Sequence, residues 1–272
     1  MTARPIWRAG GRQDGSPGVP GTPRPAARDR SGFEAVLARD ERIEPGDWMP
    51  EAYRTAVGRQ IAQHARHFAR GLRAEREWIT RAPTLQHRAS LFARVQARAA
   101  HVLHLTSTAD TLSADRSGTA ERLLTGPQGD CSILGRPARG FAEVGVIGWL
   151  VDGAALCLLA PLRRSSYGPL ARATLLVCRG EFFHRRQGYE LLLTTTHASA
   201  RQRAVVQAAV DRWWWPALLM FGPPGAGPSG DARADAWKVA RPSGEELRRS
   251  FVARTAPQAE RLGVRLYDRQ PP

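Results

Sequence analysis

The chain has 272 residues, 42% of them hydrophobic, which is enough for one large domain or two small domains with a substantial core. Lys plus Arg number 40 against 25 Asp plus Glu, a formal charge of +15, but no helix-turn-helix, zinc-finger or RNP-like string accompanies the scattered basic residues, so we expect no nucleic-acid partner. The three Cys residues have no paired spacing, which argues against a disulfide framework and predicts a cytoplasmic protein with reduced thiols.

Residues 1–40 form a tail that is rich in Pro, Gly and Arg, and we predict that it is disordered. It lacks the apolar stretch of a signal peptide or a membrane anchor. A helix is predicted next, because Asp47 is a start signal with Pro50 just inside it. Apolar residues then recur at helical spacing from Tyr53 to Leu72, and Phe68 on this stripe is predicted to point inward.

A second helix is predicted after Pro83, and its core-facing stripe contains an arginine. The stripe consists of Leu91, Val95, Arg98 and Val102. His101 adjoins the stripe, three residues after the arginine. The following stretch, residues 112–140, is rich in turn signals and is predicted to connect two pairs of helices.

The segment 141–162 predicts a central helix, because it is apolar nearly all round. Its length suits a membrane span, but Glu143 and Asp152 interrupt it and glycines weaken it, so we predict a buried bundle helix and no membrane contact. A long helix follows from Pro169 to about residue 197. Its spacing places Glu181 and His184 on one face.

The C-terminal part predicts further helices. Residues 200–222 form an amphipathic helix that is kinked or ended near Pro216, residues 223–236 a flexible loop, and residues 237–272 a helical extension in which Ser243 caps a helix. No strand-period alternation competes with these patterns. The predicted fold is therefore all-α, a helical bundle over residues 41–222 with additional C-terminal helices.

The spacing of these inward residues is typical of four-helix bundles that hold two iron ions. Such bundles take a Glu from each of two helices and a Glu-x-x-His from each of the other two, because residues three apart share a face and carboxylates bridge and neutralise the ions. One such motif alone is a weak signal, since a buried Glu and His can simply bond each other. In chain order the inward residues here are Phe68, Arg98 with His101, Asp152, and Glu181 with His184.

The sequence resembles the A subunits of ring 1,2-phenylacetyl-CoA epoxidases, a family of bacterial multicomponent monooxygenases. The resemblance runs from about Glu41 to Gly263 and is carried by the strings DWMPEAYR, WITRAPTL, GVIGWLVDGAA, SYGPLARA, FHRRQGYE and RWWWPALLMFGPP. It implies a ferritin-like fold, a di-iron centre that activates oxygen, and epoxidation of the ring of phenylacetyl-CoA. It also implies partners: a ferritin-like sister subunit without metal, accessory subunits and a separate reductase.

The resemblance places the iron ligands at Phe68, Arg98, His101, Asp152, Glu181 and His184, and two of these six cannot serve. Phe68 has no ligand atom, and Arg98 carries a fixed positive charge. Two unit charges 4 Å apart interact by about 4 kcal/mol even at an effective dielectric near 20. We therefore expect no normal di-iron centre.

Two alternatives remain for the retained residues. A single metal ion could bind His101, Asp152, Glu181 and His184, or the two histidines could be ordinary buried, hydrogen-bonded residues. His64 and His67 flank the lost position at residue 68. We hypothesise that Arg98 takes the place of the metal charge and pairs with Asp152, Glu181 or both.

Three functions are compatible with these observations. The chain is a working oxygenase component, a non-catalytic binding or scaffolding paralogue that keeps the bundle and an acyl-CoA pocket, or a diverged copy without selected activity. For the chemistry, the loss of two ligands favours the second function, a non-catalytic binding or scaffolding paralogue. The sequence identifies neither catalytic nor substrate-binding residues.

Overall fold

The computed structural model describes residues 25–112, 136–222, 237 and 242–267. Within them the chain is helical, with one isolated bridge between Ile43 and Tyr167 and no strand, which confirms the predicted all-α class. The helices are α1 (Arg30–Ala38), α2 (Glu51–Ile79), α3 (Leu85–Asp110), α5 (Phe141–Val146), the π-helical η2 (Ile147–Val151), α6 (Asp152–Leu159), the 3-10 segment η3 (Ala160–Arg164), α7 (Gly168–Ala198), α8 (Ala200–Leu219) and α10 (Gly244–Leu262).

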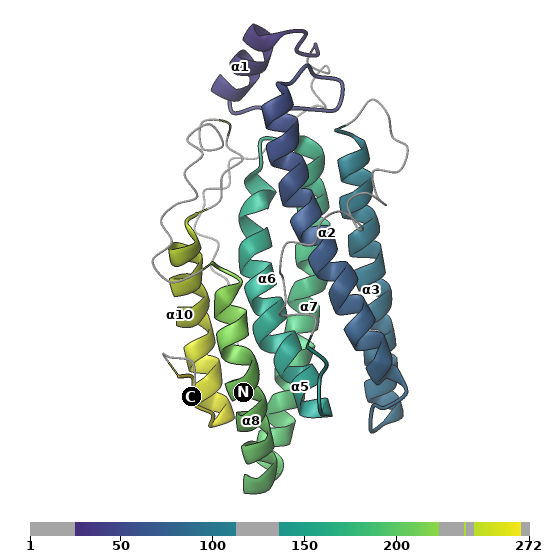
Figure 1. Cartoon of the computed structure of the whole chain (residues 1–272), viewed down its shortest axis with the longest axis vertical. Coiled ribbons are helices and arrows are strands. Elements are labelled where there is room, and N and C mark those ends of the chain that lie inside the picture. The colour runs from purple at the N-terminus through teal and green to yellow at the C-terminus, as the bar shows by residue number, and fades with distance from the viewer. Residues whose placement is uncertain (1–24, 113–135, 223–236, 238–241, 268–272) are drawn as a thin grey trace, which may run out of the picture.

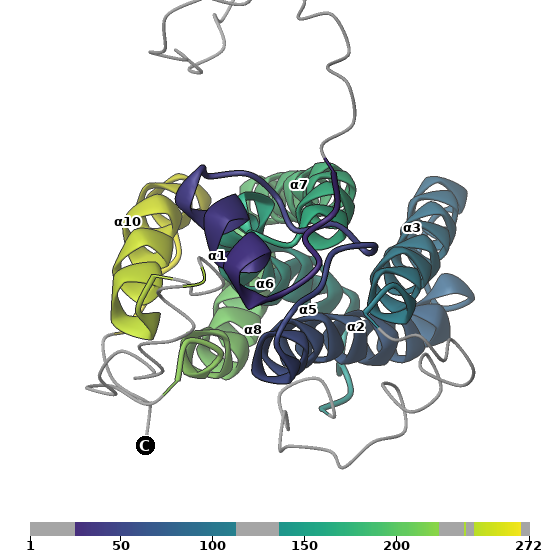
Figure 2. The ribbon, with the colours of Figure 1, turned by 90° about the horizontal axis from the view of Figure 1, so that it is seen from above.

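The long helices are arranged as a ferritin-like bundle. α2 and α3 lie side by side on one flank, the α5–α6 run and α7 occupy the centre, and α8 and α10 cover the other flank (Figures 1 and 2). α3 also packs on α7. We refer to α2, α3, the α5–α6 run and α7 as the four-helix unit. α8 lies within residues 41–222, the range predicted for the bundle, and α10 lies within residues 237–272, the range predicted for the C-terminal extension.

Two hydrophobic cores lie on either side of the bundle centre. One is shared by α2, α3, η3 and α7 and includes Ile61, Phe68 and Leu105. The other is shared by α6, α8 and α10 and includes Trp213 and Phe251. Polar side chains are gathered between the two, where they are cut off from water.

The helical run Phe141–Arg164 is the one segment among the described residues that is apolar and long enough to cross a membrane. Of its most apolar window, 78% is buried inside the bundle, which supports the prediction of a core helix. The run is not a regular α-helix, because η2 has π-helical hydrogen bonds directly before Asp152. Single π-helical turns are frequent at functional sites, and here the turn precedes the central acid.

α1 corrects the prediction that all of residues 1–40 are disordered. Its N-cap Asp29 accepts a hydrogen bond from the Gly32 backbone, and Phe33 and Val36 are 1% exposed. The Phe33 ring packs edge-on against Tyr53 of α2, with 5.1 Å between ring centroids. The helix is therefore held by burial of a short apolar stripe. Residues 1–24, the predicted loop 223–236 and most of the predicted connection 112–140 lie outside the described residues.

We expect Gly188→Ala to destabilise the bundle, because Gly188 sits where α7 crosses the central run. A Cβ there would lie 3.0 Å from the carbonyl oxygen of Gly145 and 3.2 Å from the Cα of Gly148, both of them backbone atoms. Overpacking of this kind costs about 1 to 3 kcal/mol, which thermal denaturation would show as a lower Tm. The control is Gly58→Ala in α2, where the nearest atom is 3.8 Å away and the better helix propensity of Ala should leave the Tm equal or higher. Equal Tm values for the two variants would contradict the close approach.

Candidate functional site

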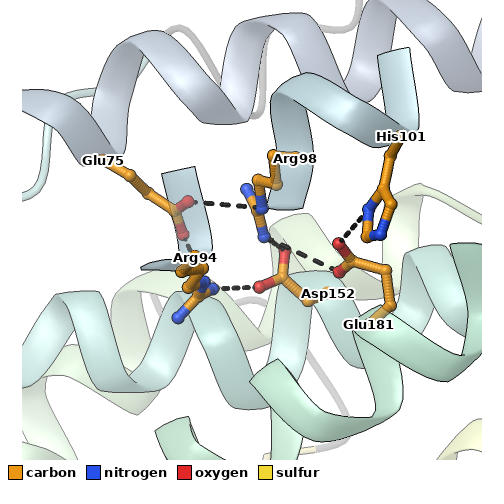
Figure 3. Close-up of polar contacts among 6 residues, drawn as sticks. All are labelled: Glu75, Arg94, Arg98, His101, Asp152 and Glu181. Carbon is orange, nitrogen blue, oxygen red and sulfur yellow. Dashed lines mark hydrogen bonds and ion pairs between the residues drawn. The ribbon is translucent and has the colours of Figure 1, made fainter. Parts of the chain in front are cut away.

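Charged side chains from four helical segments meet in the centre of the bundle. Figure 3 shows Glu75 from α2, Arg94, Arg98 and His101 from α3, Asp152 from the start of α6 and Glu181 from α7. We refer to these six residues as the central cluster. Arg98, Asp152 and Glu181 are 0% exposed, so the charges of the cluster must be balanced by the protein itself.

Arg98 lies in the middle of the cluster. Its Nη2 is 2.5 Å from Oδ1 of Asp152 and 3.8 Å from Oε2 of Glu181, and its Nε is 3.2 Å from Oε2 of Glu75. Arg98 therefore forms ion pairs with both Asp152 and Glu181, which agrees with the hypothesis that it pairs with one or both of these residues. Burial by itself lowers the pKa of Arg98, but the charges of Asp152 and Glu75 outweigh it and raise the pKa above its ordinary value. The guanidinium stays charged.

Arg94 is a second buried arginine of the cluster, and it is not among the site residues predicted from the sequence. Its Nε is 2.7 Å from Oε1 of Glu75, and its Nη2 donates a hydrogen bond to Oδ2 of Asp152. Each oxygen of Asp152 therefore faces a different guanidinium. Glu75, which was also missed, bridges the two arginines; burial raises its pKa, against the charges of Arg94 and Arg98.

The sequence did contain a signal for both missed residues. Arg94 precedes Arg98 by one helical turn, so the two project from one face of α3. Glu75 follows Phe68 by two turns on the inward face of α2.

Glu181 and His101 form the other end of the cluster. The Nδ1 atom of His101 is 3.1 Å from Oε1 of Glu181. Burial raises the pKa of Glu181, but Arg98 and His101 outweigh it and bring the pKa to about 2. Glu181 is therefore an anion, held by an arginine on one oxygen and an imidazole on the other.

Phe68 lies beside the cluster, as its inward position predicts. It is 1% exposed, and its ring centroid is 5.5 Å from that of His101 and 5.5 Å from that of His67. An aromatic ring therefore faces the imidazole where the family resemblance implies a carboxylate. Phe68 also belongs to the core shared by α2, α3 and α7.

Two buried histidines next to the cluster have unmatched ring nitrogens. Among the described residues, neither ring nitrogen of His184 has a hydrogen-bond partner. The Nε2 atom of His67 also has none among them. Burial lowers the pKa of both side chains to about 4. They are neutral at pH 7. His184 is buried, as the interpretation of a core histidine expects, but the hydrogen bond expected with it is not found among the described residues. His64 is likewise buried on α2.

Stability should fall as the pH is lowered from about 7 to 5. The pKa of His67 and His184 is about 4 in the folded chain and near 6.5 in the unfolded chain, so the unfolded chain binds more protons in this window. Stability is then full above the unfolded pKa and is lost below it, by about 1 to 2 kcal/mol for each histidine at pH 5. Urea unfolding at several pH values measures the slope.

The histidine contribution is measured as the difference in this slope between a histidine variant and the unaltered chain. A direct reading of the slope is not enough, because the raised pKa of Glu75 changes stability with pH in the opposite sense. His67→Gln should make the slope shallower, whereas His197→Gln, at an exposed position on α7, should leave it unchanged. If His67→Gln does not alter the slope of stability against pH, the conclusion that His67 is buried in its neutral form is contradicted.

Three glycines make room for the long side chains of the cluster. A Cβ on Gly71 of α2 would collide with Nη1 of Arg98, and a Cβ on Gly148 would lie 2.8 Å from Nη1 of Arg94. A Cβ on Gly180 would lie 2.6 Å from Nε2 of His101. The two arginines therefore fit because neighbouring segments carry no side chain there.

The residues of the cluster do not fit a pair of iron ions. Such a pair needs several carboxylates that are free to bridge and neutralise it, but both oxygens of Asp152 already face guanidinium groups. A divalent ion about 4 Å from the Arg98 charge would be repelled by roughly 8 kcal/mol at an effective dielectric near 20. Within the described residues no group of three or more His, Cys, Asp or Glu side chains has the geometry to hold a metal ion.

Comparison with known proteins agrees with the resemblance seen in the sequence. The profile of the family described as "Phenylacetic acid catabolic protein" matches residues 24–271. The chain is 46% identical over 236 residues to the A subunit of 1,2-phenylacetyl-CoA epoxidase from Escherichia coli (strain K12), and the match covers 87% of this chain and 76% of that relative.

Proposed function

Because the chain belongs to the phenylacetic acid catabolic protein family, we propose that it is an epoxidase A-subunit homologue that binds partners without activating oxygen. The observation that carries the proposal is the position of Arg98, whose nitrogen lies between the carboxylates of Asp152 and Glu181. The family's two irons would supply oxygen activation. In this chain the corresponding space is filled by a fixed cation and by the ring of Phe68.

The proposed role follows from what the cluster does in the bundle. Arg94 and Arg98 join α3 to α2 through Glu75 and to the central run through Asp152, and His101 joins α3 to α7 through Glu181. These contacts hold the four-helix unit together in the way that bridging ligands hold a metal-containing bundle. Because the cluster holds the helices in place, the outer surface that contacts partner subunits keeps its shape without a metal centre.

A groove beside the cluster supports an acyl-CoA ligand for this protein. It has a volume of about 790 Å³ and lies between α3, α5, α7 and α8, with Arg94 among its lining residues. The volume is within the range of small-molecule sites. The lining includes the apolar side chains of Leu91, Phe141 and Leu191 together with polar side chains, which suits a ligand of mixed polarity.

The alternative function is a working oxygenase component with at most one metal ion, located in the cytoplasm with its reductase and accessory subunits. The observation in its favour is that His101, Asp152, Glu181 and His184 are all retained, and that both nitrogens of His184 lack a partner among the described residues. This alternative requires that the metal ion displace the side chain of Arg98.

Two measurements separate the proposed function from its alternatives. Protein purified from iron-replete cells should contain far less than one iron per chain; a value near one or two would support an oxygenase component. A pull-down with the ferritin-like sister subunit should retain the chain, with the Escherichia coli relative as the positive control. Loss of sister-subunit binding would instead indicate a diverged copy without this role.

A further inference from the structure

We propose that the outer face of α3 is a contact surface for a second copy of this chain, which pairs with it in antiparallel orientation about Gln96. α3 lies at the edge of the bundle, beside α2 and α7, and one of its sides faces away from both (Figures 1 and 2). Exposed residues recur every three or four positions along this side. They are Leu85, Ala89, Phe92, Gln96, Ala100, Leu103 and Ser107, which we refer to as the outer stripe.

The outer stripe presents large apolar side chains to water. Leu85 is 82% exposed, Leu103 65% and Phe92 53%. Single exposed apolar side chains are normal on a protein surface, but these three lie along one line of one helix, as in an interaction site. A partner that covers them removes their apolar surface from water, and the hydrophobic effect favours that contact.

The charge of the chain favours this face for contact between two copies. Each copy carries a formal charge of +15, so most pairs of surfaces on two copies repel one another. The outer stripe contains no Asp, Glu, Lys or Arg, and the exposed Arg88 beside it donates a hydrogen bond to the backbone oxygen of Ala82. A partner of opposite charge would instead suit the exposed face of α7, which carries Arg172, Arg179 and Arg186.

The spacing of the outer stripe is symmetric about Gln96, because its members stand four, seven and eleven residues away on either side. In an antiparallel pair with the two-fold axis at Gln96, every large side chain lies opposite a small one of the other copy. Large side chains opposite small ones let two helices interdigitate. Two copies of this chain meet the condition by symmetry, whereas a different chain would need a matching pattern of its own. The facing pairs are Phe92 with Ala100, Leu103 with Ala89, and Leu85 with Ser107.

The size of the contact indicates a weak, reversible dimer. From Leu85 to Ser107 a helix rises about 33 Å, and its contact strip is about 10 Å wide. This strip is roughly 330 Å² on each copy, which is below the roughly 800 Å² per partner of a standard stable interface. We therefore expect a Kd on the order of 10 to 100 μM.

Sedimentation equilibrium of the full chain tests the contact at protein concentrations from about 1 to about 300 μM, on either side of the expected Kd. The unaltered chain should pass from monomer to dimer over this range. Raising the salt concentration from about 0.05 M to about 0.5 M should strengthen the dimer, because salt screens the repulsion between two copies of like charge.

Two variants with opposite charges at one position locate the two-fold axis. Gln96→Glu and Gln96→Lys each bring two like charges together, and each should raise the Kd about tenfold or more. An equimolar mixture of the two should dimerise again, since a carboxylate then faces an ammonium group. Gln96 is exposed, and Glu and Lys have similar helix propensity, so the fold is kept. The control is Ala208→Glu at an exposed position of α8, which should leave the Kd unchanged.

A chain that stays monomeric over the whole concentration range overturns the proposal. So does a dimer that neither Gln96 variant weakens, or one that the mixture does not restore. A monomeric chain whose two Gln96 variants lose the sister subunit in the pull-down would assign the face to that subunit instead. The contact between copies does not depend on whether the chain holds a metal, so iron content and the pull-down of the unaltered chain test the proposed function separately.

Discussion

Replacing Arg98 with Ala is expected to lower the free energy of unfolding by about 3 to 5 kcal/mol in the absence of metal ions. The substitution leaves Asp152 and Glu181, both 0% exposed, with one cation fewer in a region that water does not reach. A buried carboxylate whose partner is removed loses the attraction and keeps the desolvation penalty. Urea unfolding in the presence of EDTA measures the change.

The matched control is Arg186→Ala on α7. Arg186 pairs with Glu190 at 2.7 Å, but the two side chains are 69% and 55% exposed. An exposed pair of this kind contributes about 0.5 kcal/mol, so the control should change stability little. Similar stabilities for the Arg98 and Arg186 variants would mean that Arg98 is not the internal counter-ion of the cluster.

Asp152→Asn is expected to destabilise the chain by about 3 kcal/mol, because it removes the shared acceptor of two arginines. Charge-assisted hydrogen bonds contribute about 1.5 to 3 kcal/mol each, and the new amide would also point a donor at one guanidinium. The effect should be smaller than that of Arg98→Ala. Without the Asp152 charge, the two arginines still face the two carboxylates of Glu75 and Glu181, so the buried charges balance.

The control for Asp152 is Asp211→Asn in α8. Asp211 accepts a hydrogen bond from the neutral amide of Gln207 at 2.7 Å, so its replacement should cost about 1 kcal/mol or less. Chemical denaturation of both variants gives the comparison. A reversed order, in which Asp152→Asn is more damaging than Arg98→Ala, would show that the charge balance of the cluster is wrongly assigned.

Helical periodicity and resemblance predict much of this site. They place Arg98, Asp152 and Glu181 at inward positions of neighbouring helices, and these three side chains meet in the structure. They also predict that Phe68 points to the centre, where it packs on His101. The reason is that a regular helix fixes which residues share a face, so a correct register carries every inward residue with it.

Arg94 and Glu75 could not be deduced with the same ease. A search for ligand spacing looks for acids and histidines, whereas Arg94 reaches the centre through a long side chain next to Gly148. The partner of a buried arginine depends on tertiary packing, which the pattern of one helix does not contain.

Two local features of the fold are not predictable from the sequence pattern, each for a physical reason. The π-helical turn of η2 lies in a segment that is apolar nearly all round, so a change of helical period leaves no trace in the pattern. α1 follows a tail rich in Pro and Gly, whose composition hid the short stripe of Phe33 and Val36. The N-cap Asp29 was the available signal for this helix.

The most direct test of the central claim is a crystal structure of the chain grown with excess ferrous ion and measured at the iron absorption edge. We expect a nitrogen of Arg98 between the carboxylates of Asp152 and Glu181, and no anomalous peak within reach of His101 or His184. One or two iron peaks bound by these carboxylates, with the Arg98 side chain turned away from them, would contradict the account.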